Sequence, residues 1–346
     1  MRISLRRAAA CGIVPLASYI LSACGGGSTN PAVSASNVAA SFRADKPQYK
    51  CPCLYVANRG TFQGAHATVT VYPASARGRA VPMAIISGSN TGLNVPWGVA
   101  LDSSGNVYVT NSSGNSVTEY AAGANGNVSP LATISGSNTQ FNMPGGIALD
   151  AGNNIYVSNY SSQTVEVFVA GANGNASPVQ LISGSNTNLS EPLGIAVDGA
   201  ENIYVASSHN ASVEVFAAGA NGNATPSRTI TGSNTKLDVP TGLAINGHGN
   251  IYVASLGDHA PPYSVNVFAP DADGNATPTQ YIEGTLTKLD YPYGVALDSS
   301  GKIHVANEET NSVSTFGARA NGDVRPGNTL HGRGTHVAAP VGIFIR

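Results

Sequence analysis

The side chains of this 346-residue chain that are best suited to acid–base chemistry or metal binding fall in a few irregular segments. They are His66, His259 and His336 with Glu308, and Asp258 and Arg333 lie in the same irregular segments. Imidazole and carboxylate groups bind Zn²⁺ or transfer protons only where they converge on one point, and the order of these residues does not show convergence. We therefore treat them as a candidate recognition surface, and a metal or acid–base site as the alternative.

Composition and motifs argue against several functional classes. Charged residues make up only 10% of the chain and the formal net charge is −2. Binding to nucleic acid through phosphate neutralisation needs a basic surface, so we expect no nucleic-acid partner. The sequence also lacks a Gly-x-Ser-x-Gly nucleophile elbow, a phosphate-binding glycine loop and a His-Glu-x-x-His zinc motif. We expect no cofactor and no metal.

The first 24 residues combine a basic start, an apolar middle and a cysteine. Arg6 and Arg7 precede the apolar residues 8–20, and Leu-Ser-Ala-Cys ends the segment at Cys24. This segment resembles the lipobox of bacterial lipoproteins, which implies cleavage after residue 23 and acylation of Cys24. More than one acyl chain gives stable membrane anchoring. The alternative is an ordinary cleaved signal peptide with an incidental cysteine.

The same resemblance implies a location and a domain organisation. Residues 1–23 form the signal peptide, residues 24–50 a lipidated flexible tether rich in Gly, Ser, Ala and Asn, and residues 51–346 the folded domain. The residue after Cys24 is Gly25 and not an aspartate, and in this the sequence resembles lipoproteins that are sorted to an outer membrane. We therefore expect a protein of the bacterial cell envelope, anchored in the outer membrane by the lipid on Cys24.

Two further cysteines, Cys51 and Cys53, flank one proline at the start of the folded domain. Thiol pairs in exported proteins tend to oxidise, so we expect a local disulfide. A bridge across a single residue is strained and relatively reducible. A thiolate site for a soft metal is the alternative.

After the tether, the chain repeats itself. A Pro-x-Gly tripeptide followed by alternating apolar residues recurs six times, at intervals of 48 residues with one interval of 52. The copies are Pro96-Trp97-Gly98, Pro144-Gly145-Gly146, Pro192-Leu193-Gly194, Pro240-Thr241-Gly242, Pro292-Tyr293-Gly294 and Pro340-Val341-Gly342.

Each repeat contains four short runs of β-branched or aromatic residues with period-two alternation. In the first complete copy the predicted strands are 98–102, 106–110, 116–120 and 131–134. Asn-Gly or Asp-Gly pairs such as Asn125-Gly126 lie between the last two strands and indicate turns with positive φ at both positions. Four antiparallel strands in a repeat of this length predict a blade of a β-propeller.

The number of repeats predicts how the ring closes. The strand at 54–57 has no inner strand before it, and the strand at 342–345 has no partner after it. We expect these two to pair and to complete an all-β, six-bladed propeller. Such closure removes the sheet edges that an open ring would expose.

The repeat resembles the NHL-repeat six-bladed propellers, a superfamily that includes gluconolactonase-like and streptogramin-lyase-like enzymes. The clearest copy runs Pro-Leu-Gly-Ile-Ala-Val-Asp from Pro192 and continues with Asn-Ile-Tyr-Val-Ala from Asn202. The resemblance covers about residue 53 to the end. It implies the architecture and leaves the function open, because this fold hosts enzymes, scaffolds and ligand binders.

The same resemblance implies that the residue between the proline and the glycine faces the channel, where the related enzymes carry metal ligands or catalytic groups. These positions here are Trp97, Gly145, Leu193, Thr241, Tyr293 and Val341, with no carboxylate or imidazole among them. The position that ends the second strand holds Asn58, Asn111, Asn159, Ser207, Ser255 and Asn307, and no acid. These departures count against the enzyme activities.

The remaining interpretation of the channel mouth is a binding site. Trp97 and Tyr293 offer aromatic faces, and Asn58, Asn111 and Asn307 offer amides, which suits an uncharged or sugar-like ligand. The alternative is that the two aromatic residues merely plug the channel. The sequence thus predicts a non-catalytic binding or assembly module for a protein, a carbohydrate or a small molecule, with a hydrolase or lyase that has an off-pattern active site as the alternative.

Overall fold

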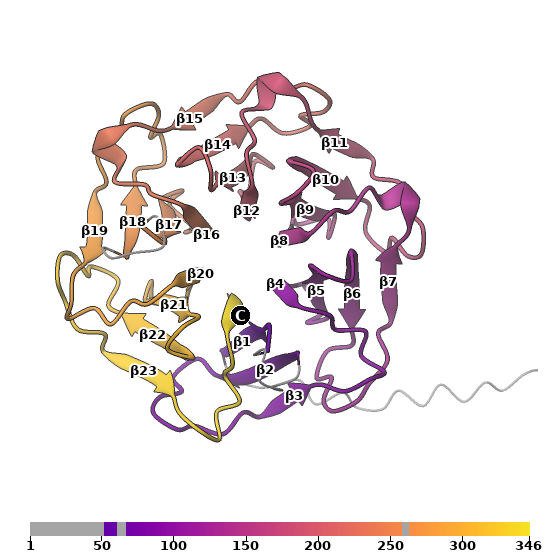
Figure 1. The fold of residues 1–346 in the computed structure, drawn as a ribbon, viewed down its shortest axis with the longest axis horizontal. Helices are drawn as coiled ribbons and strands as arrows, with labels where there is room; N and C mark the ends of the chain where they lie inside the picture. Colours follow the sequence, from indigo (N-terminus) through magenta and orange to yellow (C-terminus); the bar gives the residue numbers. More distant parts are fainter. Residues whose placement is uncertain (1–51, 61–66, 258–262) are drawn as a thin grey trace, which may run out of the picture. The chain divides into compact units, whose positions relative to one another are not determined.

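The structure is a computed structural model that describes residues 52–60, 67–257 and 263–346. In these ranges, strands β1 to β24 form six four-stranded antiparallel sheets, which stand as blades around a central channel (Figure 1). The predicted six-bladed, all-β propeller is therefore confirmed. Within the described ranges we find no helix with the length and apolar character of a membrane span.

Each blade runs from the channel outward in chain order. In the second blade, β4 (Pro96–Leu101) lies at the channel, and β5 (Val107–Asn111), β6 (Ser116–Tyr120) and β7 (Ala132–Ser135) follow toward the rim. The third blade consists of β8 (Pro144–Leu149), β9 (Ile155–Asn159), β10 (Thr164–Phe168) and β11 (Gln180–Ile182), and the fourth of β12 (Pro192–Val197), β13 (Ile203–Ser207), β14 (Ser212–Phe216) and β15 (Arg228–Ile230). The fifth blade consists of β16 (Pro240–Ile245), β17 (Ile251–Ser255), β18 (Ser264–Phe268) and β19 (Gln280–Glu283), and the sixth of β20 (Pro292–Leu297), β21 (Ile303–Asn307), β22 (Ser312–Phe316) and β23 (Asn328–His331).

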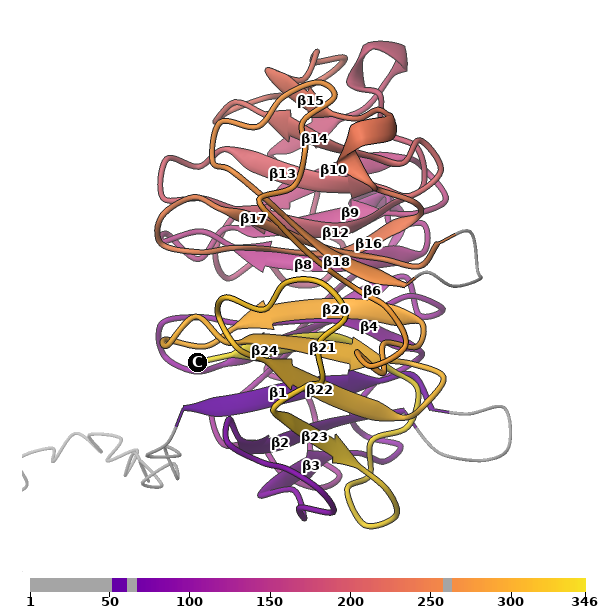
Figure 2. The ribbon, with the colours of Figure 1, turned by 90° about the vertical axis from the view of Figure 1, so that its left-hand side faces the viewer.

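The first blade, which we call the closing blade, joins the two ends of the propeller. Its inner strand is β24 (Pro340–Ile345), followed outward by β1 (Cys53–Asn58), β2 (Thr68–Pro73) and β3 (Ala84–Ile86). Leu54 pairs with Ile345 and Val56 with Ile343, as the sequence predicts. The side view shows β24 between β1 and β20 (Figure 2).

The hydrophobic core lies mainly between neighbouring blades. One cluster, for example, joins Tyr108 and Val117 of the second blade to Ile147 and Val157 of the third. Because each blade packs both of its faces against its neighbours, the middle strands are almost wholly buried.

The six inner strands approach the axis so closely that the glycine of each Pro-x-Gly has no room for a side chain. A Cβ atom built on Gly242 would lie 2.2 Å from the carbonyl oxygen of Tyr293, and one on Gly342 would lie 2.2 Å from that of Trp97. Both distances are far below van der Waals contact. The glycine therefore sets how tightly neighbouring blades converge.

The Asn-Gly pairs have a different role from the one that the sequence suggested. Gly126 has a φ of 79°, but Asn125 does not share its positive φ, so the two-residue turn prediction is wrong. The Asn125 side chain instead accepts a hydrogen bond of 2.9 Å from the amide of Ile85, and Gly126 forms a parallel bridge with Ile86. The pair is a clasp that joins the β6–β7 loop of the second blade to the outer strand β3 of the closing blade.

The glycine ring gives a first prediction. We expect Gly242→Ala to lower the free energy of unfolding by about 3 kcal/mol, because the new methyl group meets backbone atoms that cannot move aside. Urea unfolding measures the change. Gly199→Ala is the control, since its Cβ would meet no atom within 4 Å and Ala151 already occupies the matching position of the third blade. Equal losses in the two variants would contradict the steric explanation.

Candidate functional site

The channel mouth is built from residues at two positions of the repeat. The first lies between the proline and the glycine and begins the inner strand, as Trp97, Leu193 and Tyr293 do. The second directly follows the second strand of each blade. It is occupied by Arg59, Ser112, Tyr160, Ser208, Leu256 and Glu308.

The backbone at the second position is held by the residue before each proline. Ser112 donates its amide to the carbonyl of Val95 over 3.0 Å, and Tyr160 donates to Met143 over 3.1 Å. Val95 and Met143 have φ values of 52° and 54°, in the left-handed region that non-glycine residues rarely adopt. This strained contact turns the side chain after the second strand toward the axis.

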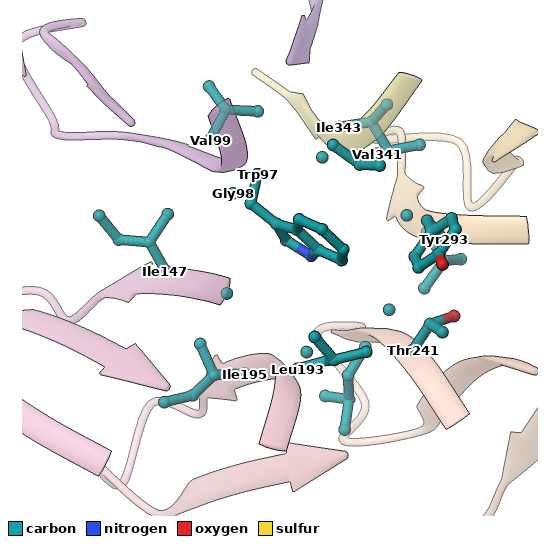
Figure 3. Close-up of a pocket in the computed structure, with 17 residues that line it drawn as sticks. Trp97, Gly98, Val99, Ile147, Leu193, Ile195, Thr241, Tyr293, Val341 and Ile343 are labelled. Carbon is teal, nitrogen blue, oxygen red and sulfur yellow. The ribbon is translucent and has the colours of Figure 1, made fainter. Parts of the chain in front are cut away.

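An aromatic floor closes the channel below the mouth. The Trp97 indole lies across the channel, with Leu193, Thr241 and Tyr293 around it (Figure 3). The rings of Trp97 and Tyr293 meet edge to face, with centroids 5.4 Å apart and planes at 87°. This geometry is favourable for two aromatic rings, so each ring holds the other in place across the channel.

Arg59 covers this floor from the mouth. Its guanidinium carbon lies 5.0 Å from the centre of the Trp97 ring and 5.7 Å from that of Tyr293. The guanidinium also forms an ion pair with Glu308, and the two side chains are only 25% and 14% exposed. Burial lowers the pKa of Arg59, and Tyr293 opposes this shift. An arginine stays charged under such a shift, so the mouth contains a half-buried cation held by two rings and a carboxylate.

Above the floor lies a cavity of about 280 Å³, with Arg59, Trp97 and Tyr293 on one side and Tyr160, Glu191 and Leu193 on the other. Tyr160 forms a side-chain hydrogen bond with Glu191, and its pKa rises to about 12 because of burial and this carboxylate. Ser112 and Ser208 add hydroxyl groups to the lining. The cavity thus offers apolar surface beside a carboxylate and hydroxyls, which suits one small polar molecule.

Three of the asparagines expected at the mouth lie elsewhere. Asn58, Asn111 and Asn307 are fully buried and do not line the cavity. The Asn111 side chain accepts the amide of Asn94 over 3.0 Å and donates to the Thr118 hydroxyl over 3.1 Å. Their amides hold neighbouring strands and loops in place, so we leave them out of the candidate site.

Other residues singled out from the sequence are only partly brought together. Glu308 joins the mouth through Arg59, whereas Arg333 and His336 are exposed on the loop between β23 and β24 and do not line the cavity. His66, Asp258, His259, Cys24 and Cys51 lie outside the described residues, so the predicted disulfide of Cys51 with Cys53 and the lipidation remain predictions. Cys53 itself is buried at the start of β1. Among the described side chains, no three His, Cys, Asp or Glu residues are grouped to hold a metal.

Arg59, Tyr160 and Glu191 line the cavity but were not predicted from the sequence. The prediction named the last residue of the second strand, whereas the side chain of the next residue faces the cavity. A signal was present: the strand-ending position is Asn or Ser in every repeat, whereas the position after it holds five different residue types.

Comparison with known proteins identifies the repeat and the fold. The NHL repeat model matches residues 93–120 and 141–168. The chain is similar to a structure from a nidogen/laminin complex, with 19% identity and a TM-score of 0.55 over 85% of this chain and 97% of that one. It is also similar to a putative 6-phosphogluconolactonase of Bacteroides fragilis, with 12% identity and a TM-score of 0.56 over 87% and 99%. A protein of unknown function from Bacteroides caccae gives 10% identity and a TM-score of 0.59 over 85% and 98%.

At these identities the likeness to solved structures shows the fold alone. No curated protein matches the chain in sequence.

The half-buried ion pair of Arg59 and Glu308 gives a second prediction. We expect Arg59→Met to lower the free energy of unfolding by about 2–4 kcal/mol, because it removes the cation–π contacts and leaves the Glu308 carboxylate without its partner. Adding Glu308→Gln to Arg59→Met should recover part of the lost free energy of unfolding, because the half-buried side chain at this position then carries no unpaired charge. Urea unfolding followed by the fluorescence of Trp97, the single tryptophan, measures both effects.

Arg228→Met combined with Glu308→Gln is the control for this cycle. Arg228 and Glu308 lie in different blades and do not contact each other, so the changes that their substitutions cause in the free energy of unfolding should add. Additive losses for the Arg59 and Glu308 pair would show that the ion pair contributes nothing.

Proposed function

Because this chain is a six-bladed β-propeller that carries NHL repeats, we propose that it acts as a lipid-anchored binding module outside the cytoplasm. Its ligand site is the cavity at the channel mouth, and its ligand is a small uncharged molecule with several hydroxyl groups, such as a monosaccharide. The lipid on Cys24 holds the propeller at a membrane of the bacterial envelope, and the segment up to residue 50 tethers it.

One observation carries this proposal. The side chains that follow the second strands differ from blade to blade, although the strands around them repeat closely, and five of the six line a single cavity. Variation gathered around one cavity on a rigid repeated scaffold is typical of binding sites. The sixth side chain, Glu308, neutralises Arg59, so the cavity does not favour an anion.

The chemistry of the lining narrows the ligand class. Trp97, Leu193 and Met143 provide apolar surface for the carbon face of a sugar ring. Glu191 and the hydroxyls of Ser112 and Ser208 provide hydrogen-bond partners for its hydroxyl groups. A cavity of about 280 Å³ limits the bound part to about one ring.

A monosaccharide panel tests the proposed ligand. We expect at least one sugar to raise the thermal unfolding temperature and to change the fluorescence of Trp97, because that indole forms the cavity floor. Glu191→Gln should weaken binding about tenfold or more, since it replaces a charged hydrogen-bond acceptor. Glu201→Gln, the same change on the exposed turn of the other face, should bind as the unchanged protein does.

The outcomes separate the alternatives. Equal affinities for the two glutamate variants would place the sugar elsewhere, and no response to any sugar would exclude this ligand class. A stoichiometric metal ion in the purified protein would favour the hydrolase or lyase alternative, with His66, His259 or His336 and Glu308 as its candidate ligands.

Anchoring has its own test. We expect fatty-acid label to appear on the full-length protein and to be lost in Cys24→Ser, because the acyl chains are attached to that cysteine. The variant should also leave the membrane fraction. Cys11→Ser is the control, since Cys11 lies in the cleaved segment and should not affect labelling. Label that persists in Cys24→Ser would contradict the anchoring.

A further inference from the structure

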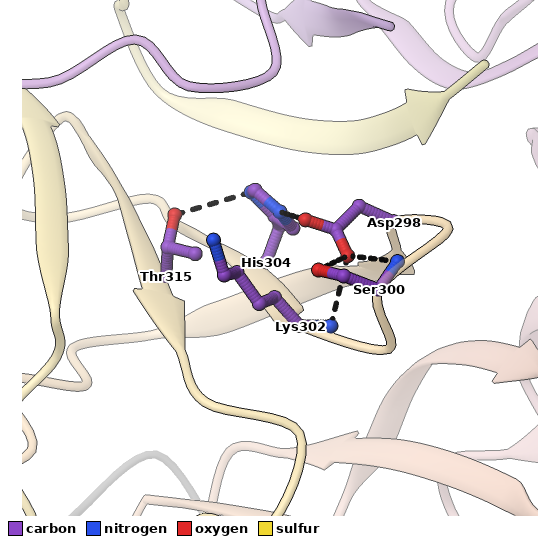
Figure 4. Close-up of polar contacts among 5 residues, drawn as sticks. All are labelled: Asp298, Ser300, Lys302, His304 and Thr315. Atoms are coloured by element: carbon purple, nitrogen blue, oxygen red, sulfur yellow. Dashed lines mark hydrogen bonds and ion pairs between the residues drawn. The ribbon is translucent and has the colours of Figure 1, made fainter.

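A second polar cluster lies on the face opposite the mouth, at the junction of the sixth and closing blades. There Thr315 Oγ1 is 3.1 Å from His304 Nδ1, and His304 Nε2 is 3.4 Å from Asp298 Oδ2 (Figure 4). His304 is 1% exposed and lies directly across from Thr315 in the pairing of β21 with β22. The contacts connect a hydroxyl, an imidazole and a carboxylate in one row.

The neighbours of this row fix its protonation. Asp298 Oδ1 accepts three hydrogen bonds, from the Ser300 amide, the Ser300 hydroxyl and the Lys302 amide, at 2.6–2.9 Å. Burial opposes ionisation of Asp298, but these hydrogen bonds outweigh it and lower its pKa. Burial also lowers the pKa of His304, against the effect of Asp298.

The network therefore favours a carboxylate beside a neutral imidazole. The imidazole donates Nε2–H to Asp298, and its Nδ1 accepts the proton of the Thr315 hydroxyl. This is the arrangement in which a base activates a hydroxyl nucleophile.

The cluster exists because this junction departs from the repeat. The other five blades carry Tyr at the position of His304, and four of them carry Val at the position of Thr315. The fourth blade has Arg228 where the sixth has Asn328, and Arg228 reaches the next blade, donating to the carbonyl of Pro270 over 2.7 Å. Asn328 is shorter, and the space that a longer side chain would cross remains open.

The open space is a cavity of about 240 Å³. Thr315, His304, Lys302 and Asn328 line one side, and Pro73 and Ala74 of the closing blade line the other. Asn328 and Lys302 bring N–H donors to the cavity that also contains the Thr315 hydroxyl. The closing-blade wall is apolar and can contact a short acyl chain.

We propose that this junction cavity hydrolyses small neutral esters, with Thr315 as nucleophile, His304 as general base, Asp298 as the group that orients His304, and Asn328 as a donor to the oxyanion. The assignment is independent of the channel mouth, with which it shares no residue.

Ester hydrolysis at this site needs no reactant other than the ester and water. Thr315 Oγ1 bonds to the ester carbonyl carbon while its proton passes to His304 Nδ1. The tetrahedral oxyanion then collapses, the bond to the alcohol oxygen breaks, and His304 returns the proton to the leaving alcohol. Water next attacks the acyl-Thr315 ester, giving its proton to His304, which passes it to Thr315 Oγ1 as the acid leaves.

The test uses the full-length chain in detergent with p-nitrophenyl acetate. We expect release of p-nitrophenol and an acetyl group on Thr315, located by mass spectrometry of proteolytic fragments. Thr315→Val and His304→Tyr should each lower the rate about 100-fold or more and abolish the acetylated species. Both variants install residues that other blades carry at these positions, so the fold is expected to persist, and thermal unfolding verifies this. Asn328→Ala should keep the acetylation site but slow its formation about 100-fold.

His248→Tyr controls for the background reaction of exposed imidazoles with this ester, because His248 is exposed on the same face. It should leave the rate unchanged. Hydrolysis at the wild-type rate by folded Thr315→Val, acetylation at another residue only, or no release above the buffer rate would each overturn the proposal.

Discussion

The close approach of six strands to one axis is the constraint on which the rest of this structure depends. A methyl group at Gly242 or Gly342 would overlap the backbone of the next blade, so the glycine fixes the distance between neighbouring inner strands. The left-handed residue before each proline then sets the direction in which the chain enters the inner strand. With the backbone fixed at these points, the residue between the proline and the glycine and the residue after the second strand can change without loss of the fold. The mouth is assembled from these two positions.

Both polar sites arise from replacing a repeated residue while the backbone around it stays the same. At the mouth, Arg59 and Glu308 occupy equivalent positions in adjacent blades and neutralise each other above an aromatic floor. At the junction, His304 stands where three other blades use Tyr to contact this turn, as Tyr204 does with Asp198 over 3.2 Å. The aspartate of this turn contacts a phenol hydroxyl in one blade and an imidazole in another. A single substitution of Tyr by His therefore places a base beside the same carboxylate.

The sequence predicts the architecture well because period-two alternation and the Pro-x-Gly spacing are local and repeated six times. The strand that ends in Ile345 could be paired with Leu54 by counting alone. The Asn-Gly clasps could not be predicted, because Asn125 contacts Ile85 of another blade and a local turn explains the same dipeptide. Arg59 was missed for a related reason: which side chain at a strand end faces the axis depends on the strained contact with the residue before proline. The contact of His304 with Thr315 could not be predicted either, because it depends on the register in which β21 pairs with β22.

The way the ring closes also determines how the domain carries mechanical load. β1 has β2 on one side and β24 on the other, with register pairs along its whole length on both sides. A pull along β1 from the residues before Pro52 acts parallel to the strand. It therefore shears both ladders of hydrogen bonds at once and does not open them one pair at a time. The seam at which the two ends of the propeller meet is thus the part of the ring best placed to bear tension applied along β1.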